Sequence, residues 1–295
     1  MPQPRELVVP ATAAGVRLDA WLSQALGDTS RAAAADLIAR GAVLVDGDRC
    51  AKSTRLHGGE RVRIDAPQPV RAVAGVPQPV LVWDNESLAV IDKPAGLVVH
   101  PAPAHGGLTL VEWLAQRHGD WDPRAVHRLD RDTSGLMLVA KGEPAQRELQ
   151  AALRRRDVVR EYLALATGRL AARSGTIDAP IGRDVRRRTR MSTRTDKPRA
   201  ARTHFEVETF AEAHTLARVR LETGRTHQIR AHFAAIGHPL AGDREYGAHD
   251  DLGLARQFLH STRLGLHVPP AGDWREWRSE LPPDLAAALH RASTP

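Results

Sequence analysis

The residues best suited to chemistry lie in one charged run ahead of an apolar segment. Residues 127–135 read His-Arg-Leu-Asp-Arg-Asp-Thr-Ser-Gly, and the apolar run at 136–140 predicts a buried strand. Asp130 is flanked by Arg128 and Arg131, and neighbouring guanidinium groups favour the ionised form of a carboxyl group. Asp130 can therefore serve as a nucleophile or a general base, or it can anchor an ordinary ion-pair network in a loop.

Two other interpretations of this run fail on spacing. A kinase catalytic loop has His-Arg-Asp in direct succession and an Asn at a fixed distance, whereas Leu129 intervenes here and no such Asn follows. A zinc site needs a second His or Cys at ligand spacing, and none accompanies His127. The run therefore offers a carboxylate among cations rather than a kinase loop or a zinc site.

A second stretch supplies a cation that needs such a carboxylate. The alternation of apolar and charged residues at 217–222 predicts a half-buried strand. Thr226 can cap a following helix, whose inward face includes Ile229. Arg230 lies beside that face, and a partly buried arginine needs an anion, for which Asp130 is the candidate.

The composition suits a polyanionic partner. The 295 residues include 42 Lys and Arg against 35 Asp and Glu, which gives a net charge of +7 at pH 7 and a pI of about 10.4. A merely basic soluble protein has the same balance. Cys50 is the single cysteine, no run approaches the ~20 apolar residues of a membrane span, and the N-terminus lacks an apolar signal region. We therefore expect a cytoplasmic protein.

The chain divides into a small module, a linker and a larger domain. Residues 1–70 combine helical spacing with short apolar runs around an Asp-Gly hairpin turn, and they are rich in arginine. A small protein-interaction module fits this pattern as well. Four prolines and no periodicity at 66–80 indicate a linker at 71–80, ahead of a second domain at 81–295.

Four features of the second domain bear on binding. The pair Lys93-Pro94 at a strand end can bring an ammonium group to a phosphate, although it can equally be a plain loop. Tyr162, one of two tyrosines, lies on an aliphatic strand and can belong to the core or to a site. The basic stretch at 174–203 is either disordered or holds RNA. An amphipathic helix at 144–156 ends in three arginines, which complement its dipole.

The run at 127–135 has the form His-Arg-Leu-Asp-x-x-Thr-Ser-Gly and resembles the signature of the RluA-type pseudouridine synthases. Three further stretches resemble motifs of that family in the same order: Lys93-Pro94, Arg160-Glu161-Tyr162, and residues 221–243 continued by Tyr246-Gly247.

The flanking regions extend the resemblance. The N-terminal module resembles the S4 RNA-binding domain, in Arg17-Leu18-Asp19, Ser30-Arg31 and Asp46-Gly47. Residues 179–200 resemble the corresponding loop of the subgroup called ribosomal large subunit pseudouridine synthase D, with Asp196 where that subgroup has Gly.

The resemblance implies an α+β fold, in which a mixed, mostly antiparallel sheet forms the catalytic domain and a small α/β S4-like domain precedes it. It implies an isomerase, an intramolecular transferase that converts uridine to pseudouridine in RNA, foremost in large-subunit rRNA, and needs no cofactor. By position, Asp130 is the catalytic aspartate, Arg230 pairs with it and Tyr162 stacks on the target base. Attack by Asp130 at the sugar and attack at the base both remain open.

The same resemblance implies the RNA contacts. Arg128 would fill the space left by the target base or hold the backbone, and the flipped base would have to leave its stack. The other expected RNA-binding residues are Lys93, Arg225, His227, Arg183, Arg31 and Arg17. We expect no metal, no membrane and a monomer, with large-subunit rRNA or the assembling subunit as the partner.

Two alternatives stay open. The same chemistry can act on a different RNA, such as tRNA. A non-catalytic RNA-binding factor in ribosome assembly also fits the charge and the S4-like module, but it would have no need of Asp130, Tyr162 and Arg230.

Overall fold

The computed structural model describes residues 5–27, 29, 31–39, 41–64, 78–100, 107–187, 190–248 and 252–293. The described residues form two compact units, one within residues 5–64 and one that contains residues 78–100 and 108–293. Ser30 and most of the linker expected at 71–80 lie outside the described residues.

The smaller unit packs helices against a four-stranded antiparallel sheet of order β1-β4-β2-β3. Its core is apolar and includes Leu18, Trp21 and Leu22 of the first helix. The elements are β1 (Arg5–Val8), the short 3-10 helix η1 (Ala11–Ala13), α1 (Leu18–Ala25), α2 (Arg31–Ala39), β2 (Val43–Val45), β3 (Asp48–Arg49) and β4 (Arg61–Ile64).

The Asp-Gly turn predicted in this unit is present. Asp46 and Gly47 both have positive φ, 51° and 91°, and they join β2 to β3 with Val45 opposite Asp48. Two positive φ values in a two-residue loop match the twist of the strands on either side. The Asp-Gly pair adopts this geometry through its own residues, so the turn could be predicted from the sequence alone.

The larger unit contains one large sheet with helices on both faces. Its helices are α3 (Leu110–Arg117), α4 (Glu143–Arg155), α5 (Gln228–Ala235) and α6 (Pro283–Ser293). Its strands are β5 (Val80–Asp84), β6 (Leu88–Lys93), β7 (Pro123–Ala125), β8 (Ser134–Lys141), β9 (Val159–Thr167), β10 (Ser174–Asp178), β11 (Gly182–Arg183), β12 (Met191–Ser192), β13 (Arg202–Phe210), β14 (His214–Leu221), β15 (Leu259–Val268) and β16 (Asp273–Arg278).

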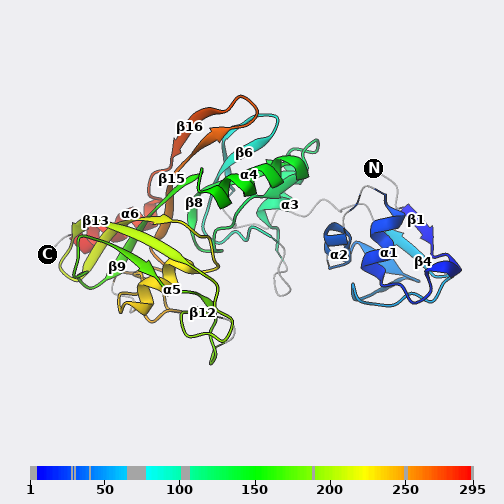
Figure 1. The fold of residues 1–295 in the computed structure, drawn as a ribbon, viewed down its shortest axis with the longest axis horizontal. Helices are drawn as coiled ribbons and strands as arrows, with labels where there is room; N and C mark the ends of the chain where they lie inside the picture. Colours follow the sequence, from blue (N-terminus) through cyan, green and yellow to red (C-terminus); the bar gives the residue numbers. More distant parts are fainter. Residues whose placement is uncertain are drawn as a thin grey trace. The chain divides into compact units, whose positions relative to one another are not determined.

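The described strands of the large sheet follow the order β10-β13-β14-β9-β15-β8-β6-β5, with β16 paired to β15 and β7 to β8 (Figure 1). All pairs are antiparallel except β15 with β8, which run parallel for two residue pairs. The sheet is therefore mixed and mostly antiparallel, as predicted. Its one parallel junction places the start of β8 beside β15, whose other edge pairs with β9.

Apolar side chains on the two faces of the sheet decide where the helices lie. One core joins Leu110 of α3 and Phe233 of α5 to the inner face of β6, β8, β9 and β14. On the opposite face, α4 lies along β8 (Figure 1). Leu149 of α4 packs there with Leu136 and Leu138 of β8. None of the described helices is long and apolar enough to cross a membrane.

Of two helices predicted from the sequence, one matches the structure closely and the other begins later than predicted. Residues predicted as a helix at 144–156 form α4 with a shift of one residue at each end. The predicted cap at Thr226 is wrong, because His227 adopts a left-handed conformation with φ of 54° and α5 begins only at Gln228. The side-chain oxygen of Gln228 instead accepts hydrogen bonds from the Thr223 hydroxyl at 2.7 Å and the Arg225 amide at 3.0 Å.

Gly135 is required at the parallel junction. Its φ is +107°, and a Cβ atom at this position would lie 2.3 Å from the carbonyl oxygen of Ser261 on β15. No side chain fits between two backbones at this distance, so the glycine that ends the charged run is a condition for β8 and β15 to meet.

We expect Gly135→Ala to lower the free energy of unfolding by about 3 kcal/mol or more, since it combines a strained φ with a backbone clash. Urea denaturation measures this change. Gly119→Ala is the matched control, because a Cβ there meets no atom within 4 Å. Equal stability of the two variants would contradict the role given to the junction.

Candidate active site

A buried guanidinium group joins three carboxylates at the start of α5. Arg230 donates from Nε to Oδ2 of Asp243 at 2.6 Å and from Nη2 to Oδ1 of the same group at 2.9 Å. Its Nη2 also donates to Oε2 of Glu245 at 2.7 Å, and its Nη1 donates to Oδ2 of Asp130 at 3.3 Å. The pairing expected between Arg230 and Asp130 is therefore present.

The cluster explains how Arg230 tolerates burial. Its side chain is 7% exposed, and burial alone would lower the pKa of the guanidinium group. The hydrogen bonds and the charge of Asp243 outweigh burial, with help from Asp130 and Glu245, and they raise the pKa of Arg230 above its usual range. An arginine bound to Asp243 through two parallel hydrogen bonds has little freedom to turn. It thus holds the Asp130 carboxylate from one side.

Sequence reasoning missed Asp243 and Glu245. Both follow Gly242, at or just after the end of the stretch 221–243, in a segment without helical or strand periodicity. The available signal was the arginine itself, because a guanidinium group has five donors and one carboxylate cannot satisfy them all.

Lys93 holds the loop that carries Asp130. Its ammonium group is fully buried and donates to the carbonyl oxygens of Pro94 at 2.8 Å, Leu97 at 2.9 Å and Arg131 at 2.9 Å. Burial lowers the pKa of Lys93 to about 7, against the opposing charges of Asp132 and Asp130. All three donors are used inside the protein, so the prediction that Lys93 holds a phosphate is wrong.

Residues ahead of β15 and within it secure the rest of the loop. Arg256 donates from Nη1 to the carbonyl oxygen of Asp132 at 3.0 Å, and Gln257 donates to the Thr133 hydroxyl at 3.1 Å. The Ser134 hydroxyl lies 2.9 Å from Nδ1 of His260. The loop is therefore held from two sides, by Lys93 at the end of β6 and by residues at the start of β15 and just ahead of it.

Asp130 lies in a small pocket that has apolar side chains on part of its wall and polar or charged side chains on the rest. The apolar part includes Tyr162, Leu221, Ile229 and Leu259. The side chain of Asp130 is 14% exposed. A carboxylate among flat and aliphatic side chains suits a planar, uncharged ring.

Tyr162 and His227 complete the pocket. Burial raises the pKa of Tyr162, so its phenol stays neutral at physiological pH. His227 was predicted to bind RNA, and the structure places its Nε2 3.9 Å from Oδ1 of Asp130. Its Nδ1 lies 3.2 Å from the Tyr246 hydroxyl and 3.7 Å from Oε2 of Glu245.

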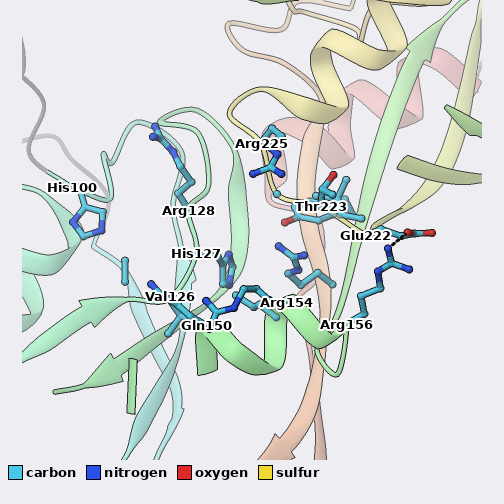
Figure 2. Close-up of a pocket in the computed structure, with 16 residues that line it drawn as sticks. His100, Val126, His127, Arg128, Gln150, Arg154, Arg156, Glu222, Thr223 and Arg225 are labelled. Carbon is cyan, nitrogen blue, oxygen red and sulfur yellow. Dashed lines mark ion pairs between the residues drawn. The ribbon is translucent and has the colours of Figure 1, made fainter. Parts of the chain in front are cut away.

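A larger basic pocket of about 610 Å³ adjoins the first (Figure 2). The two pockets share Arg128, Arg225, Tyr162 and Leu221. Figure 2 shows Arg128 and His100 on one side of the larger pocket and Arg225 and Thr223 on the other. Its described lining contains Arg128, Arg154, Arg156, Arg160 and Arg225 but one acidic residue, Glu222, which pairs with Arg156 at 2.7 Å.

The other predicted RNA contacts occupy three places. Arg225 donates from Nε to the carbonyl oxygen of Ala200 at 3.0 Å, and Arg183 lies exposed on β11. In the smaller unit, Arg17 and Arg31 lie 2.8 and 3.3 Å from the carboxylate of Asp19. The hydrogen bond from Arg17 lowers the pKa of Asp19, with a further contribution from Arg31. The structure thus leaves these arginines in separate regions, and only Arg128 and Arg225 line the two pockets.

No group of three or more His, Cys, Asp or Glu side chains within the described ranges is placed to hold a metal ion.

Residues 87–235 match the family model of RNA pseudouridylate synthase. An uncharacterized RNA pseudouridine synthase of Chloroflexus aurantiacus is 43% identical to this chain over 97% of this chain and 93% of its own length. The chain belongs to the RNA pseudouridylate synthase family. As a pseudouridine synthase it is an isomerase.

Further comparisons agree with this synthase assignment. Ribosomal large subunit pseudouridine synthase D of Nitrosomonas europaea is 43% identical over 96% of this chain and 86% of its own length. The solved structure of human RNA pseudouridylate synthase domain containing 1 matches with a TM-score of 0.60 and 26% identity, over 74% of this chain and 90% of that one. Residues 16–62 match the S4 domain model, which confirms the resemblance seen in Arg17-Leu18-Asp19 and Asp46-Gly47.

We expect Asp243→Asn to lower the free energy of unfolding of this synthase by about 3 kcal/mol, because it removes one partner of a buried ion pair. Glu245→Gln removes a carboxylate that is 37% exposed and bound to the same arginine, so its cost should be about 1 kcal/mol or less. Urea denaturation compares the two variants. Similar losses for both would contradict the claim that Asp243 is the principal anchor of Arg230.

Proposed function

We propose that this synthase converts uridine to pseudouridine in large-subunit ribosomal RNA, with Asp130 as its catalytic residue. The observation that carries the proposal is the position of Asp130, fixed by buried Arg230 at one side of a pocket that also contains Tyr162. The choice of RNA is supported by similar chains named ribosomal large subunit pseudouridine synthase D, from Nitrosomonas europaea and Yersinia pestis among others.

The reaction breaks the bond between N1 of uracil and C1′ of ribose and forms a bond between C5 of uracil and C1′. C5 loses its proton and N1 gains one, so the product has the same atoms as the substrate. The ionised carboxylate of Asp130 supplies the nucleophile for this exchange. It attacks the sugar or the ring, and the base turns before it is rejoined through carbon.

The neighbours of Asp130 have separate tasks in this proposal. Arg230 holds the carboxylate in place through the hydrogen bond from its Nη1 to Oδ2 of Asp130. Tyr162 lies against the flipped base, and the apolar walls formed by Leu221 and Ile229 exclude water from it. Arg128, exposed between the two pockets, occupies the place that the base leaves in the RNA or holds the adjoining backbone.

RNA binding rests on charge spread over both units. The arginines of the larger pocket, those of the β11–β12 region and those of the S4 domain hold phosphates, and such binding weakens as salt is raised. Attachment through two units also raises the local concentration of the substrate at the catalytic pocket. We propose the cytoplasm as the location of this RNA chemistry.

We expect Asp130→Asn to form no detectable pseudouridine while its RNA affinity stays within a few fold of the wild-type value, because the variant keeps the shape of the pocket but loses the nucleophile. Carbodiimide treatment and primer extension of rRNA transcripts map the product, and fluorescence anisotropy gives the affinity. The wild-type protein, assayed without added metal, should produce new stops in a large-subunit hairpin.

Turnover by Asp130→Asn would contradict the catalytic role of Asp130. Stops on tRNA in place of rRNA would overturn the choice of substrate and keep the chemistry. Tight RNA binding by the wild type with no stops on rRNA, on an assembling large subunit or on bulk tRNA would support a non-catalytic assembly factor instead.

A further inference from the structure

One buried arginine has no carboxylate partner. The described part of the chain contains three arginines less than 10% exposed, and two of them are paired: Arg230 with three carboxylates and Arg256 with Asp284 at 2.7 Å. The third, Arg160, is 7% exposed. Its Nε is buried without a hydrogen-bond partner, and no ion pair joins it to a described carboxylate.

An isolated buried cation is costly, and proteins ordinarily neutralise it with a nearby anion. The neighbours of Arg160 do not supply a negative charge. Burial, together with the charge of Arg160, lowers the pKa of His127 to about 3, and the same charge opposes the rise in the pKa of Tyr162 that burial causes. Arg160 is therefore a cation beside two neutral side chains, His127 and Tyr162, and no negative charge balances it.

The guanidinium group of Arg160 lines the larger pocket, where an anion can reach it. A Cβ at residue 224 would lie 3.1 Å from Nη1 of Arg160, so Gly224 leaves this approach open. Glu222, the acidic residue of the lining, is occupied by Arg156 at 2.7 Å and by His204 at 2.7 Å. The lining therefore offers Arg160 no free carboxylate, and an anion that pairs with Arg160 would have to come from a bound ligand.

The position of Arg160 relates it to the catalytic pocket. Arg160 and Tyr162 are two residues apart on β9, so both side chains leave the same face of the strand at a spacing of roughly 7 Å. Arg128 and Arg225 line both pockets and extend the positive charge between them. An anionic group covalently linked to a nucleotide whose base lies beside Tyr162 would therefore be within reach of Arg160.

We propose that Arg160 binds a backbone phosphate of the RNA next to the target uridine, with Gly224 providing its access. This inference rests on the proposed function. A phosphate diester fits because a guanidinium group meets its two free oxygens with two parallel hydrogen bonds. Binding would supply the charge that the folded protein lacks.

The test pairs the protein variant with a change in the RNA. The RNA is a synthetic hairpin that contains the uridine converted in the mapping experiment, with single neutral methylphosphonate linkages placed at each position around it. The proteins are the full-length wild type, Arg160→Met and Arg160→Lys. Arg278→Met is the charge-matched control, because Arg278 is 75% exposed on β16 and lines neither pocket.

We expect Arg160→Met to bind the unmodified hairpin about tenfold or more weakly, the usual size for a lost charge-assisted contact. The slope of log affinity against log salt should become shallower by about 0.7 to 0.9, one phosphate contact. One neutral linkage should weaken wild-type binding similarly and leave Arg160→Met unaffected. Arg160→Lys should retain most of the salt slope, and Arg278→Met should match the wild type.

The thermal midpoint of Arg160→Met should equal or exceed that of the wild type, because an uncompensated buried charge is removed. A lower midpoint together with an unchanged salt slope would assign Arg160 a structural role and overturn the proposal. Additive losses at every linkage would do the same. Failure of the proposed function would appear separately, as a wild-type protein that converts no uridine.

Discussion

The buried contact between Arg230 and its carboxylates is the interaction on which the rest of the site depends. The side chain of Asp130 is 14% exposed, and its carboxylate lies 3.3 Å from the guanidinium group of Arg230. The guanidinium group of Arg230 is itself buried. Asp243 offsets the cost of this burial by binding it with two parallel hydrogen bonds. The order of dependence therefore runs from the loop at Asp243, through α5, to the carboxylate of Asp130. We expect a change at any of these steps to alter the position of that carboxylate.

The sheet brings these groups together through its one parallel contact. The loop with Asp130 precedes β8, Tyr162 lies on β9, and β15 runs between the two strands. Gly135 admits the backbone of β15 beside the start of β8, and β9 pairs with the other edge of β15. Lys93 then ties the end of β6 to the same loop through three carbonyl oxygens. Rigid strands thus position a loop that must stay open to substrate.

Much of the fold could be predicted from local sequence patterns. The pairing of charged side chains that are far apart in the sequence could not. Strand β8, helix α4 and the turn at Asp46 follow from periodicity and turn chemistry, because neighbouring residues determine them. The need of Arg230 for an anion was also visible from its place beside an apolar face. The identity of its main partner was not, since Asp243 lies in an irregular loop. Lys93 and Arg160 show the same limit: burial of a charged side chain depends on segments far away in sequence, here the loop at Arg131 and the turn at Gly224.

The most direct test of the central claim is the single-turnover rate of tritium release from C5 of the target uracil by Arg230→Lys. Lysine keeps the charge, but a single ammonium group cannot bind Asp243 with two parallel hydrogen bonds and still orient Asp130. We expect a rate about 100-fold below that of the wild type, at similar RNA affinity, as is usual when a reacting group is misplaced. A rate equal to that of the wild type would show that orientation by Arg230 is not what makes Asp130 reactive.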